Sequence, residues 1–251
     1  PGYAAFLAEV ARTYGDRIDA YGTWNEPNID RGWTGTDAAA YARLHQLAYA
    51  AVKSEDPSAR VLLGPLAGTG LDPFGYITRA YDAGVRGSVD IVGWNSYPPG
   101  TPETPVSPAS GAELSGPFTL ARMLRRLDPG RRVWSTETSW STCATCPDFN
   151  VASMRMQADY LLRTYAYKRR YLHGFVERVF WYNVADGERS NDWSSNHGLV
   201  LNGTFAPKPA YTAAVRMPVQ LQRAPSTVIV TRTTSRASVR KLRVAPRQGE
   251  L

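Results

Sequence analysis

The stretch Tyr21-Gly22-Thr23-Trp24-Asn25-Glu26-Pro27-Asn28 lies where a short apolar strand, predicted over residues 18–24, comes to its end. It places a carboxylate, Glu26, directly after that strand. Pro27 cannot donate a hydrogen bond to a sheet, and it disfavours helical backbone in the residue before it. We therefore expect the strand to stop here, with Glu26 held in an extended conformation.

Strand and helix patterns alternate along the rest of the chain. Further apolar strands are predicted over 61–63, 89–94, 133–136 and 178–182, the first of them ended by Gly64-Pro65. Amphipathic helices are predicted over 3–14, 74–83, 118–127 and 151–171. Another long helix is predicted to begin after an N-cap at Thr36 or Asp37, with an apolar face that runs from Tyr41 to Val52. Short apolar strands separated by helices indicate βαβ units and a parallel sheet that is buried on both faces.

The spacing of the strand ends favours an α/β fold of the (β/α)8 TIM-barrel class. An eight-unit barrel of about 250 residues uses roughly 30 residues or more per strand and helix, and the spacings of the five strand ends of this chain are compatible with that. We expect these strands to be barrel strands 4 to 8, with three units upstream. The predicted domains are 1–220, the C-terminal part of the barrel, and 221–251, a basic tail, linker or start of a truncated β domain.

A second carboxylate ends a later strand in the same manner. Glu137 stands in Val133-Trp134-Ser135-Thr136-Glu137-Thr138, at the end of the strand predicted over 133–136. Barrel enzymes carry their chemistry at the carboxyl ends of the strands, so we expect Glu26 and Glu137 to face each other. Such a pair suits glycosidic bond cleavage, in which one acid protonates the leaving oxygen and another group attacks or stabilises the sugar.

These motifs resemble those of clan A glycoside hydrolases. Trp24-Asn25-Glu26-Pro27-Asn28 together with Thr136-Glu137 is most similar to families 5 and 39, over roughly residues 3–215. The resemblance implies that Glu26 is the acid/base and Glu137 the nucleophile. One residue departs from the family 5 pattern, because Asn95 stands where that family commonly has a histidine.

The resemblance also implies roles for neighbouring residues. Asn25 would contact the 2-hydroxyl of the sugar, Tyr97 would hydrogen-bond the nucleophile, and Trp181 would form the floor of the subsite. Aromatic rings suit sugars because the apolar C–H faces of a sugar pack on a flat π surface. The predicted substrate-binding residues are Asn25, Trp24, Tyr97, Trp94, Trp140 and Trp181, with Tyr182 as a further candidate.

The charge of the chain is concentrated at its C-terminal end. From Arg216 onward there are eight basic residues and one acid, Glu250, and this excess equals the whole formal net charge of +7. The remainder is balanced, which argues against a nucleic-acid groove on the folded body. No apolar stretch approaches the ~20 residues that a membrane span needs. We expect a monomer whose partner is a carbohydrate substrate, with neither nucleic acid nor membrane involved.

Cysteine and histidine spacing gives little support to a metal site. Cys143 and Cys146 form a Cys-Ala-Thr-Cys motif without a second pair of ligands near it, so a local disulfide or plain thiols are the favoured interpretation. We expect no metal and no organic cofactor.

The sequence therefore predicts retaining hydrolysis of O-glycosidic bonds, in a β-linked oligo- or polysaccharide, by a two-glutamate double displacement. The family resemblance implies secretion to the extracellular space. The alternative is a carbohydrate-binding pseudoenzyme that uses the same aromatic cleft without turnover.

Overall fold

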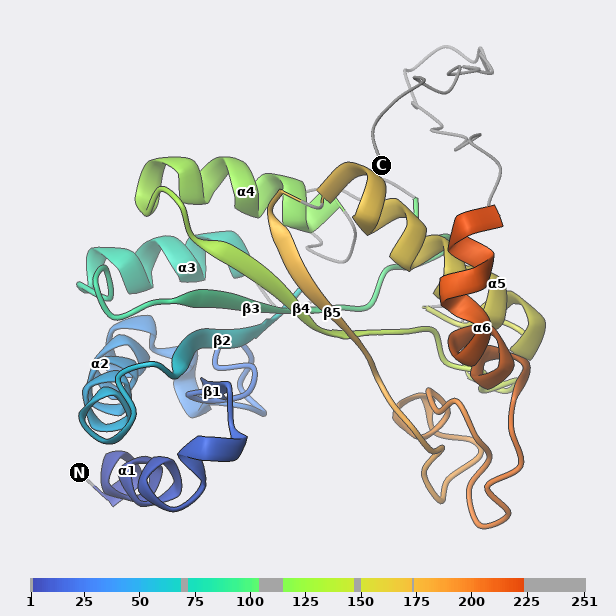
Figure 1. The fold of residues 1–251 in the computed structure, drawn as a ribbon, viewed down its shortest axis with the longest axis horizontal. Helices are drawn as coiled ribbons and strands as arrows, with labels where there is room; N and C mark the ends of the chain where they lie inside the picture. The colour runs from blue at the N-terminus through green and yellow to red at the C-terminus, as the bar shows by residue number, and fades with distance from the viewer. Residues whose placement is uncertain (1, 69–71, 104–114, 147–149, 173, 224–251) are drawn as a thin grey trace. The chain divides into compact units, whose positions relative to one another are not determined.

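The computed structural model describes residues 2–68, 72–103, 115–146, 150–172 and 174–223 (Figure 1). These residues form two compact units. The first unit contains 2–98, 115–138 and 172–182, and the second contains 99–103, 139–171 and 183–223. The predicted C-terminal tail lies outside the described residues from residue 224 onward.

The first unit is built on one parallel sheet of five strands (Figure 1). The strands are β1 (Ala20–Gly22), β2 (Arg60–Ala67), β3 (Ile91–Ser96), β4 (Arg132–Thr138) and β5 (Val176–Trp181). They pair in sequence order, β1-β2-β3-β4-β5, and every pair is parallel. The predicted parallel α/β sheet is therefore confirmed, and its order is that of consecutive βα units of a barrel.

Helices precede or connect these strands. The α-helices of the first unit are α1 (Gly2–Tyr14), α2 (Ala38–Glu55), α3 (Pro73–Asp82) and α4 (Ser115–Leu127), with 3₁₀ turns at Gly15–Arg17 and Thr34–Thr36. Asp37 caps α2 as predicted, since its side chain accepts hydrogen bonds from the backbone N–H groups of Ala39 and Ala40.

Two elements differ most from the sequence prediction, β2 and the helix predicted over 151–171. Strand β2 does not stop at Gly64-Pro65 but continues to Ala67, with a register shift against β3 between Leu63 and Leu66. An irregularity of this kind lets a strand pass through a residue that cannot donate to the sheet. The helix predicted over 151–171 begins only at Met154, where Ser153 caps it, and its last part is a π-helix, Lys168–Leu172.

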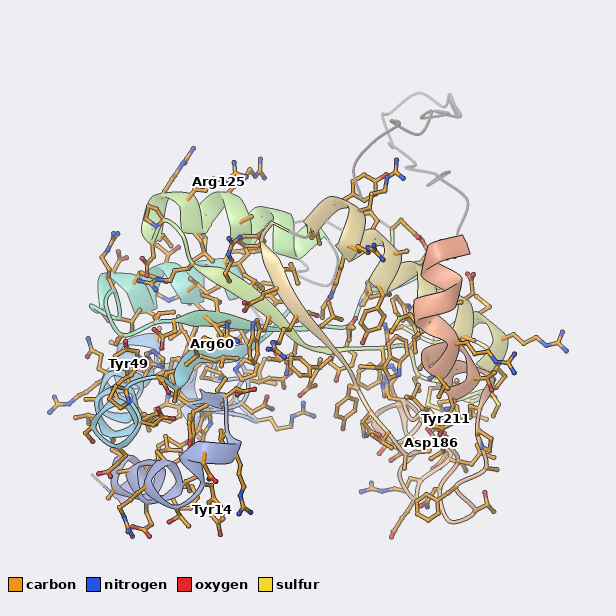
Figure 2. All side chains as sticks on the ribbon, in the orientation of Figure 1. Tyr14, Tyr49, Arg60, Arg125, Asp186 and Tyr211 are labelled. Atoms are coloured by element: carbon orange, nitrogen blue, oxygen red, sulfur yellow. A yellow bond between two sulfur atoms is a disulfide. The ribbon has the colours of Figure 1, made fainter. Side chains whose placement is uncertain are left out.

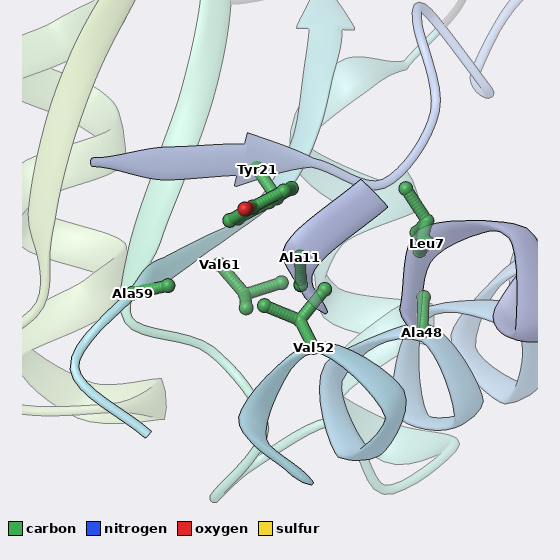
Figure 3. Packing of buried hydrophobic residues seen from close by; sticks show 7 residues of the cluster. All are labelled: Leu7, Ala11, Tyr21, Ala48, Val52, Ala59 and Val61. Atoms are coloured by element: carbon green, nitrogen blue, oxygen red, sulfur yellow. The ribbon is translucent and has the colours of Figure 1, made fainter. Parts of the chain in front are cut away.

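Alternation along β2 divides the core into two layers. Val61 points to the helices and packs with Leu7 and Ala11 of α1 and Val52 of α2 (Figure 3). Its neighbour Leu62 points to the opposite face of the sheet, where it clusters with two further buried residues, Ile91 and Trp134. The second face is the one that would line the interior of a barrel, because the helices cover the first.

A chain of buried hydrogen bonds ties α2 to the end of β1 and to the middle of β2. His45 Nε2 lies 2.7 Å from the Ser88 carbonyl, which can only accept, so Nε2 carries the proton. His45 Nδ1 therefore accepts from Thr23 Oγ1 at 2.8 Å. Thr23 in turn accepts from the Tyr41 hydroxyl at 3.0 Å, which itself accepts from the Gly64 N–H at 2.6 Å. Burial lowers the pKa of His45 to about 4 and keeps the ring neutral.

The second unit packs α5 (Met154–Tyr167) against α6 (Pro209–Arg223). A disulfide joins Cys143 to Cys146. Lys208 Nζ forms a buried ion pair with Asp186 Oδ1 at 3.0 Å; Asp186 is labelled in Figure 2. Nζ also donates to the Thr142 hydroxyl at 2.8 Å. These polar contacts fix the loop that leads from residue 183 to α6.

None of the helices in the described part of the chain combines the length and the apolar character that crossing a membrane requires. Among the same residues, no group of three or more His, Cys, Asp and Glu side chains has the arrangement of a metal site.

Lys168 provides a stability test in the second unit. Its side chain is buried, and Nζ has no hydrogen-bond partner among the described residues. Burial lowers the pKa of Lys168 from 10.5 to about 7. Between those values the unfolded chain binds a proton that the folded chain does not, so the Lys168 contribution to the free energy of unfolding rises with pH from about 7 to 10.5.

We expect Lys168→Met to stabilise the protein at pH 7 and below, because it removes a buried unpaired amine, and we expect that advantage to shrink as pH rises toward 10. Urea unfolding at pH 6, 7, 8 and 9 measures the difference. The exposed neighbour Arg169 supplies the control, Arg169→Met, which should change stability by less than about 0.5 kcal/mol. An advantage that does not vary with pH would contradict the assignment.

Candidate active site

Glu26 follows β1 and occupies a strained backbone conformation. Its φ is +50°, in the left-handed region. The prediction that Pro27 holds Glu26 in an extended conformation is therefore wrong. The backbone N–H of Glu26 donates to the Pro65 carbonyl at 2.7 Å, beside the irregularity of β2. The neighbouring strand thus holds the residue in a turn that local preference disfavours.

The loop after Glu26 is fixed on both sides. The Asn28 amide donates to the Ala67 carbonyl and accepts from the Ala67 N–H, both at 2.8 Å, so it joins the loop to the end of β2. Gly32 packs on the other side, where a Cβ would lie 2.2 Å from the Glu26 carbonyl oxygen. Only glycine fits there without moving the backbone of Glu26.

A register shift brings Glu137 to the same face as its neighbour Thr136. Pairing between β3 and β4 runs Trp94↔Ser135 and then Asn95↔Glu137, so Thr136 is the extra residue. Strict alternation would send Thr136 and Glu137 to opposite faces. Because of the shift, the Thr136 hydroxyl reaches Asn95 at 2.7 Å while Glu137 lies beside the same residue.

Asn95 is fully buried and lies between the two glutamates. Its Nδ2 is 3.1 Å from Glu26 Oε1 and 3.3 Å from Asn25 Oδ1. The second oxygen of Glu26 faces Arg31, whose Nη2 lies 3.4 Å from Oε2. The Glu26 side chain is 11% exposed and that of Arg31 is 83% exposed.

The hydroxyl of Tyr97 donates to Glu137 Oε2. Burial, together with the charge of Glu137, raises the pKa of Tyr97 and keeps the phenol protonated as a donor. Burial also raises the pKa of Glu137, and the negative charge of Glu26 acts in the same direction. The hydrogen bond from Tyr97, the nearby amide of Asn95 and the charge of Arg31 oppose this rise by favouring the carboxylate.

By sequence, the chain matches no family model and no curated protein. By structure, it is similar to a family 39 glycoside hydrolase from the gut symbiont Bacteroides cellulosilyticus WH2, with a TM-score of 0.63 and 26% identity over 86% of this chain and 44% of that one. A monomeric β-xylosidase from Caulobacter crescentus CB15 gives a TM-score of 0.59 and 22% identity over 84% and 44% of the two chains. The chain resembles the family 39 glycoside hydrolases.

A likeness at lower identity extends to β-glucuronidase 2 from Bacteroides uniformis, with a TM-score of 0.60 and 18% identity over 85% of this chain and 25% of that one. The chain thus spans less than half the length of these solved structures. The predicted resemblance to clan A glycoside hydrolases is confirmed, and of the two families predicted it is family 39 to which the solved neighbour from Bacteroides cellulosilyticus WH2 belongs.

Four of the predicted site residues come together at the carboxyl ends of the strands. Asn25, Glu26, Tyr97 and Glu137 are linked through the Asn95 and Tyr97 contacts. Two aromatic residues at the end of β5 are also near: Trp181 is partly buried and pairs with Thr138 of β4, and the Tyr182 ring lies 6.1 Å from that of Tyr97.

The other predicted aromatic residues are engaged elsewhere. Trp94 is fully buried on the helix side of β3, where it stacks on Phe74 at 5.2 Å. Trp140 is fully buried in the second unit, where its ring lies 5.1 Å from that of Tyr160. A ring without an exposed face cannot support a sugar, so neither is retained as a substrate contact.

Trp24 has a supporting role in the loop. Its Nε1 donates to the Gly32 carbonyl at 2.7 Å, and its ring makes edge contacts with Tyr3 and Trp33. Trp24 therefore steadies the loop that carries the strained Glu26, and we do not retain it as a sugar platform.

Sequence reasoning did not identify Asn95, Arg31 and Gly32 as parts of the site. Trp94 and Asn95 are adjacent on a strand, so only one of them can face the interior, but the sequence does not tell which, because both faces of β3 are buried. The structure decides it, since Ile91 of the same strand faces inward. Counting in twos from Ile91 selects Asn95. No local signal marks Arg31 or Gly32 either, because their positions depend on how the loop folds.

Gly32→Ala is expected to displace Glu26 without unfolding the protein. The added methyl group would meet the carbonyl oxygens of Glu26 and Asn25, which are backbone atoms and cannot swing aside. A misplacement of about 1 Å in a catalytic group can cost about 100-fold in rate, so we expect any activity that depends on Glu26 to fall by that order, with an unchanged circular dichroism spectrum. Gly2→Ala, at a position with open space, is the control. Full activity of Gly32→Ala would show that the loop tolerates the methyl group.

Proposed function

We propose that the chain carries the catalytic residues of a retaining glycoside hydrolase that acts on β-linked oligo- or polysaccharides. The observation that supports this most directly is the pair Glu26 and Glu137. They lie at the carboxyl ends of strands in one parallel sheet and share one buried neighbour, Asn95. Two such carboxylates, one able to donate a proton and one able to attack, are what a retaining mechanism requires.

In the first step, Glu137 attacks the anomeric carbon and forms a glycosyl ester. The bond between that carbon and the leaving oxygen breaks, and the proton of Glu26 passes to the departing oxygen. Glu137 must be a carboxylate for this step. The hydrogen bond from Tyr97 supports that form against the opposing effect of burial.

In the second step, water attacks the anomeric carbon of the ester. Glu26, now a carboxylate, takes a proton from the water, and the bond to Glu137 breaks to release the sugar. The configuration at the anomeric carbon is inverted twice and so retained. Both glutamates then have their starting protonation states.

Trp181, Tyr182 and Asn25 supply the substrate contacts in this proposal. The two aromatic side chains at the end of β5 are partly exposed, and Asn25 is exposed beside Glu26. The solved neighbours named as a β-xylosidase and a β-glucuronidase act on β-linked sugars, which supports a β-glycoside as substrate here.

An extracellular location is part of the same proposal. The Cys143–Cys146 disulfide supports it, because disulfides persist in oxidising surroundings and are rare in the cytosol.

Exchange of each glutamate tests the two roles separately. We expect Glu137→Gly and Glu26→Ala in the full-length protein each to lower kcat by about 100-fold or more, within the range usual for loss of a catalytic group. Added azide should restore turnover of an activated aryl β-glycoside in both variants. The product should be the α-glycosyl azide with Glu137→Gly and the β-glycosyl azide with Glu26→Ala.

The anomers are distinguished by NMR, and the first sugar released by the wild-type protein should have the β configuration. Glu9→Ala on the exposed face of α1 is the control and should leave turnover unchanged. A first product with the α configuration would contradict retention. Sugar binding without turnover in the wild-type protein would favour the pseudoenzyme instead.

Tyr97→Phe tests the electrostatics of the nucleophile. The raised pKa of Glu137 places the acid limb of kcat/KM above the pH at which an ordinary glutamate titrates. The Tyr97 hydrogen bond favours the carboxylate, so removing it should raise that pKa further and move the acid limb to higher pH. Tyr171→Phe, at a partly exposed position on the π-helix, should leave the profile in place. An unmoved or lowered acid limb in Tyr97→Phe would count against Glu137 as nucleophile.

A further inference from the structure

Asn95 is the most constrained polar side chain at the site. It is fully buried at the end of β3 and contacts the side chains of three residues from two other parts of the sheet, Asn25, Glu26 and Thr136. A buried amide with this many partners has one orientation that satisfies them all, and that orientation follows from the chemistry of the neighbours.

Thr136 and Glu26 together set the orientation of the Asn95 amide. The Thr136 hydroxyl donates to Asn95 Oδ1 at 2.7 Å, which leaves the NH₂ group to face Glu26. The flipped amide would place its oxygen against the Glu26 carboxylate, and two acceptors would then face each other without a proton between them. The register shift that makes Thr136 the extra residue of β4 is therefore what fixes Asn95.

The two hydrogens of the Asn95 NH₂ group serve two partners. One is directed to Glu26 Oε1 at 3.1 Å and the other to Asn25 Oδ1 at 3.3 Å. Because the oxygen of the Asn25 amide is occupied in this way, its own NH₂ group is turned outward. Asn25 is exposed, so it presents a hydrogen-bond donor rather than an acceptor to whatever enters the site.

The same contacts distinguish the two oxygens of Glu26. Oε1 accepts from Asn95, so a proton on the carboxyl group belongs on Oε2. Among the described residues, the hydrogen-bond partner of Oε2 is Arg31, at the long distance of 3.4 Å, and the mostly exposed Arg31 side chain is able to move away when a leaving group approaches. The proton is thus held on the accessible side of the carboxyl group.

We infer that Asn95 is a positioning residue for acid/base catalysis: it orients the Glu26 carboxyl group so that Oε2 carries the transferred proton. This inference rests on the proposed glycosidase function. Asn95 stands where family 5 commonly has a histidine. Unlike a histidine, the amide carries no charge at any pH at which the protein folds, so its contact with Glu26 persists through both steps of the cycle.

The test compares Asn95→Ala with the wild-type protein on two substrates that differ in their need for a proton. A phenyl β-glycoside has a poor leaving group and depends on the acid, whereas a 2,4-dinitrophenyl β-glycoside departs without protonation. We expect kcat/KM to fall by at least about tenfold on the phenyl substrate and by less than about threefold on the dinitrophenyl substrate, because general acid catalysis contributes about 100-fold or more.

Asn95→Asp keeps the size of the side chain and replaces the amide donor by an acid. The charged groups that face this position are Glu26 and Glu137, with Arg31 behind Glu26. We expect Asn95→Asp to lose activity on the phenyl substrate at neutral pH, because a third carboxylate repels the other two. It should regain part of that activity at acidic pH, where the introduced carboxyl group is protonated and again donates to Glu26.

Ser96→Ala is the matched control. Ser96 is the next residue of β3, is equally buried, and points to the opposite face of the sheet. It should leave the ratio of the two substrates unchanged. An equal loss on both substrates in Asn95→Ala would overturn the inference in favour of a purely structural role, and so would the absence of any loss.

Crystal structures of the wild-type protein and Asn95→Ala give a readout that does not need turnover. We expect the Glu26 carboxyl group to rotate and the Asn25 amide to lose its single orientation in the variant. Unchanged side chains would overturn the inference even if the glycosidase function stands. Conversely, a wild-type protein that hydrolyses no β-glycoside would end the proposed function, whereas the crystal structures would still decide whether Asn95 orients its neighbours.

Discussion

The hydrogen bond from the Glu26 backbone N–H to the Pro65 carbonyl anchors one half of the site. Strand β1 has already ended at Gly22, so the sheet ladder no longer fixes the chain at Glu26. A left-handed conformation in a residue other than glycine costs about 1–3 kcal/mol. The Pro65 bond and the two bonds between Asn28 and Ala67 each contribute about 0.5–1.5 kcal/mol, which is enough together to hold that strain.

The other half of the site depends on a second departure from regular sheet geometry. The register shift between β3 and β4 places Thr136 and Glu137 on one face, although they are consecutive in sequence. Thr136 orients Asn95, and Glu137 receives the Tyr97 hydroxyl. The turn at Glu26 follows the carboxyl end of β1, and the register shift lies near the carboxyl ends of β3 and β4. At these ends the backbone can bend without disturbing the apolar layers nearer the start of each strand.

The sequence was sufficient to predict the order of the elements and the position of both glutamates at strand ends, because each strand is a short apolar run ended by polar residues or proline. It was not sufficient to assign the aromatic residues. Trp94 and Trp140 looked like sugar platforms, but hydrophobicity does not tell which face of a strand a ring occupies, and both rings are buried. The turn at Glu26 was also missed, because contacts with β2 override the local effect of Pro27.

The charges around the two glutamates fit the needs of the proposed double displacement. One carboxyl group must carry a proton while the other is ionised, and a buried cation between them would favour the ionised form of both. The buried donors, Tyr97 and Asn95, are instead neutral, and the one cation that contacts Glu26 among the described residues, Arg31, is largely exposed. Tyr97 donates to Glu137 alone and favours its carboxylate, whereas Asn95 occupies one oxygen of Glu26 and leaves the other available for a proton. The two carboxyl groups therefore differ in the neutral donors that they accept from, and among the described residues no buried cation contacts either of them.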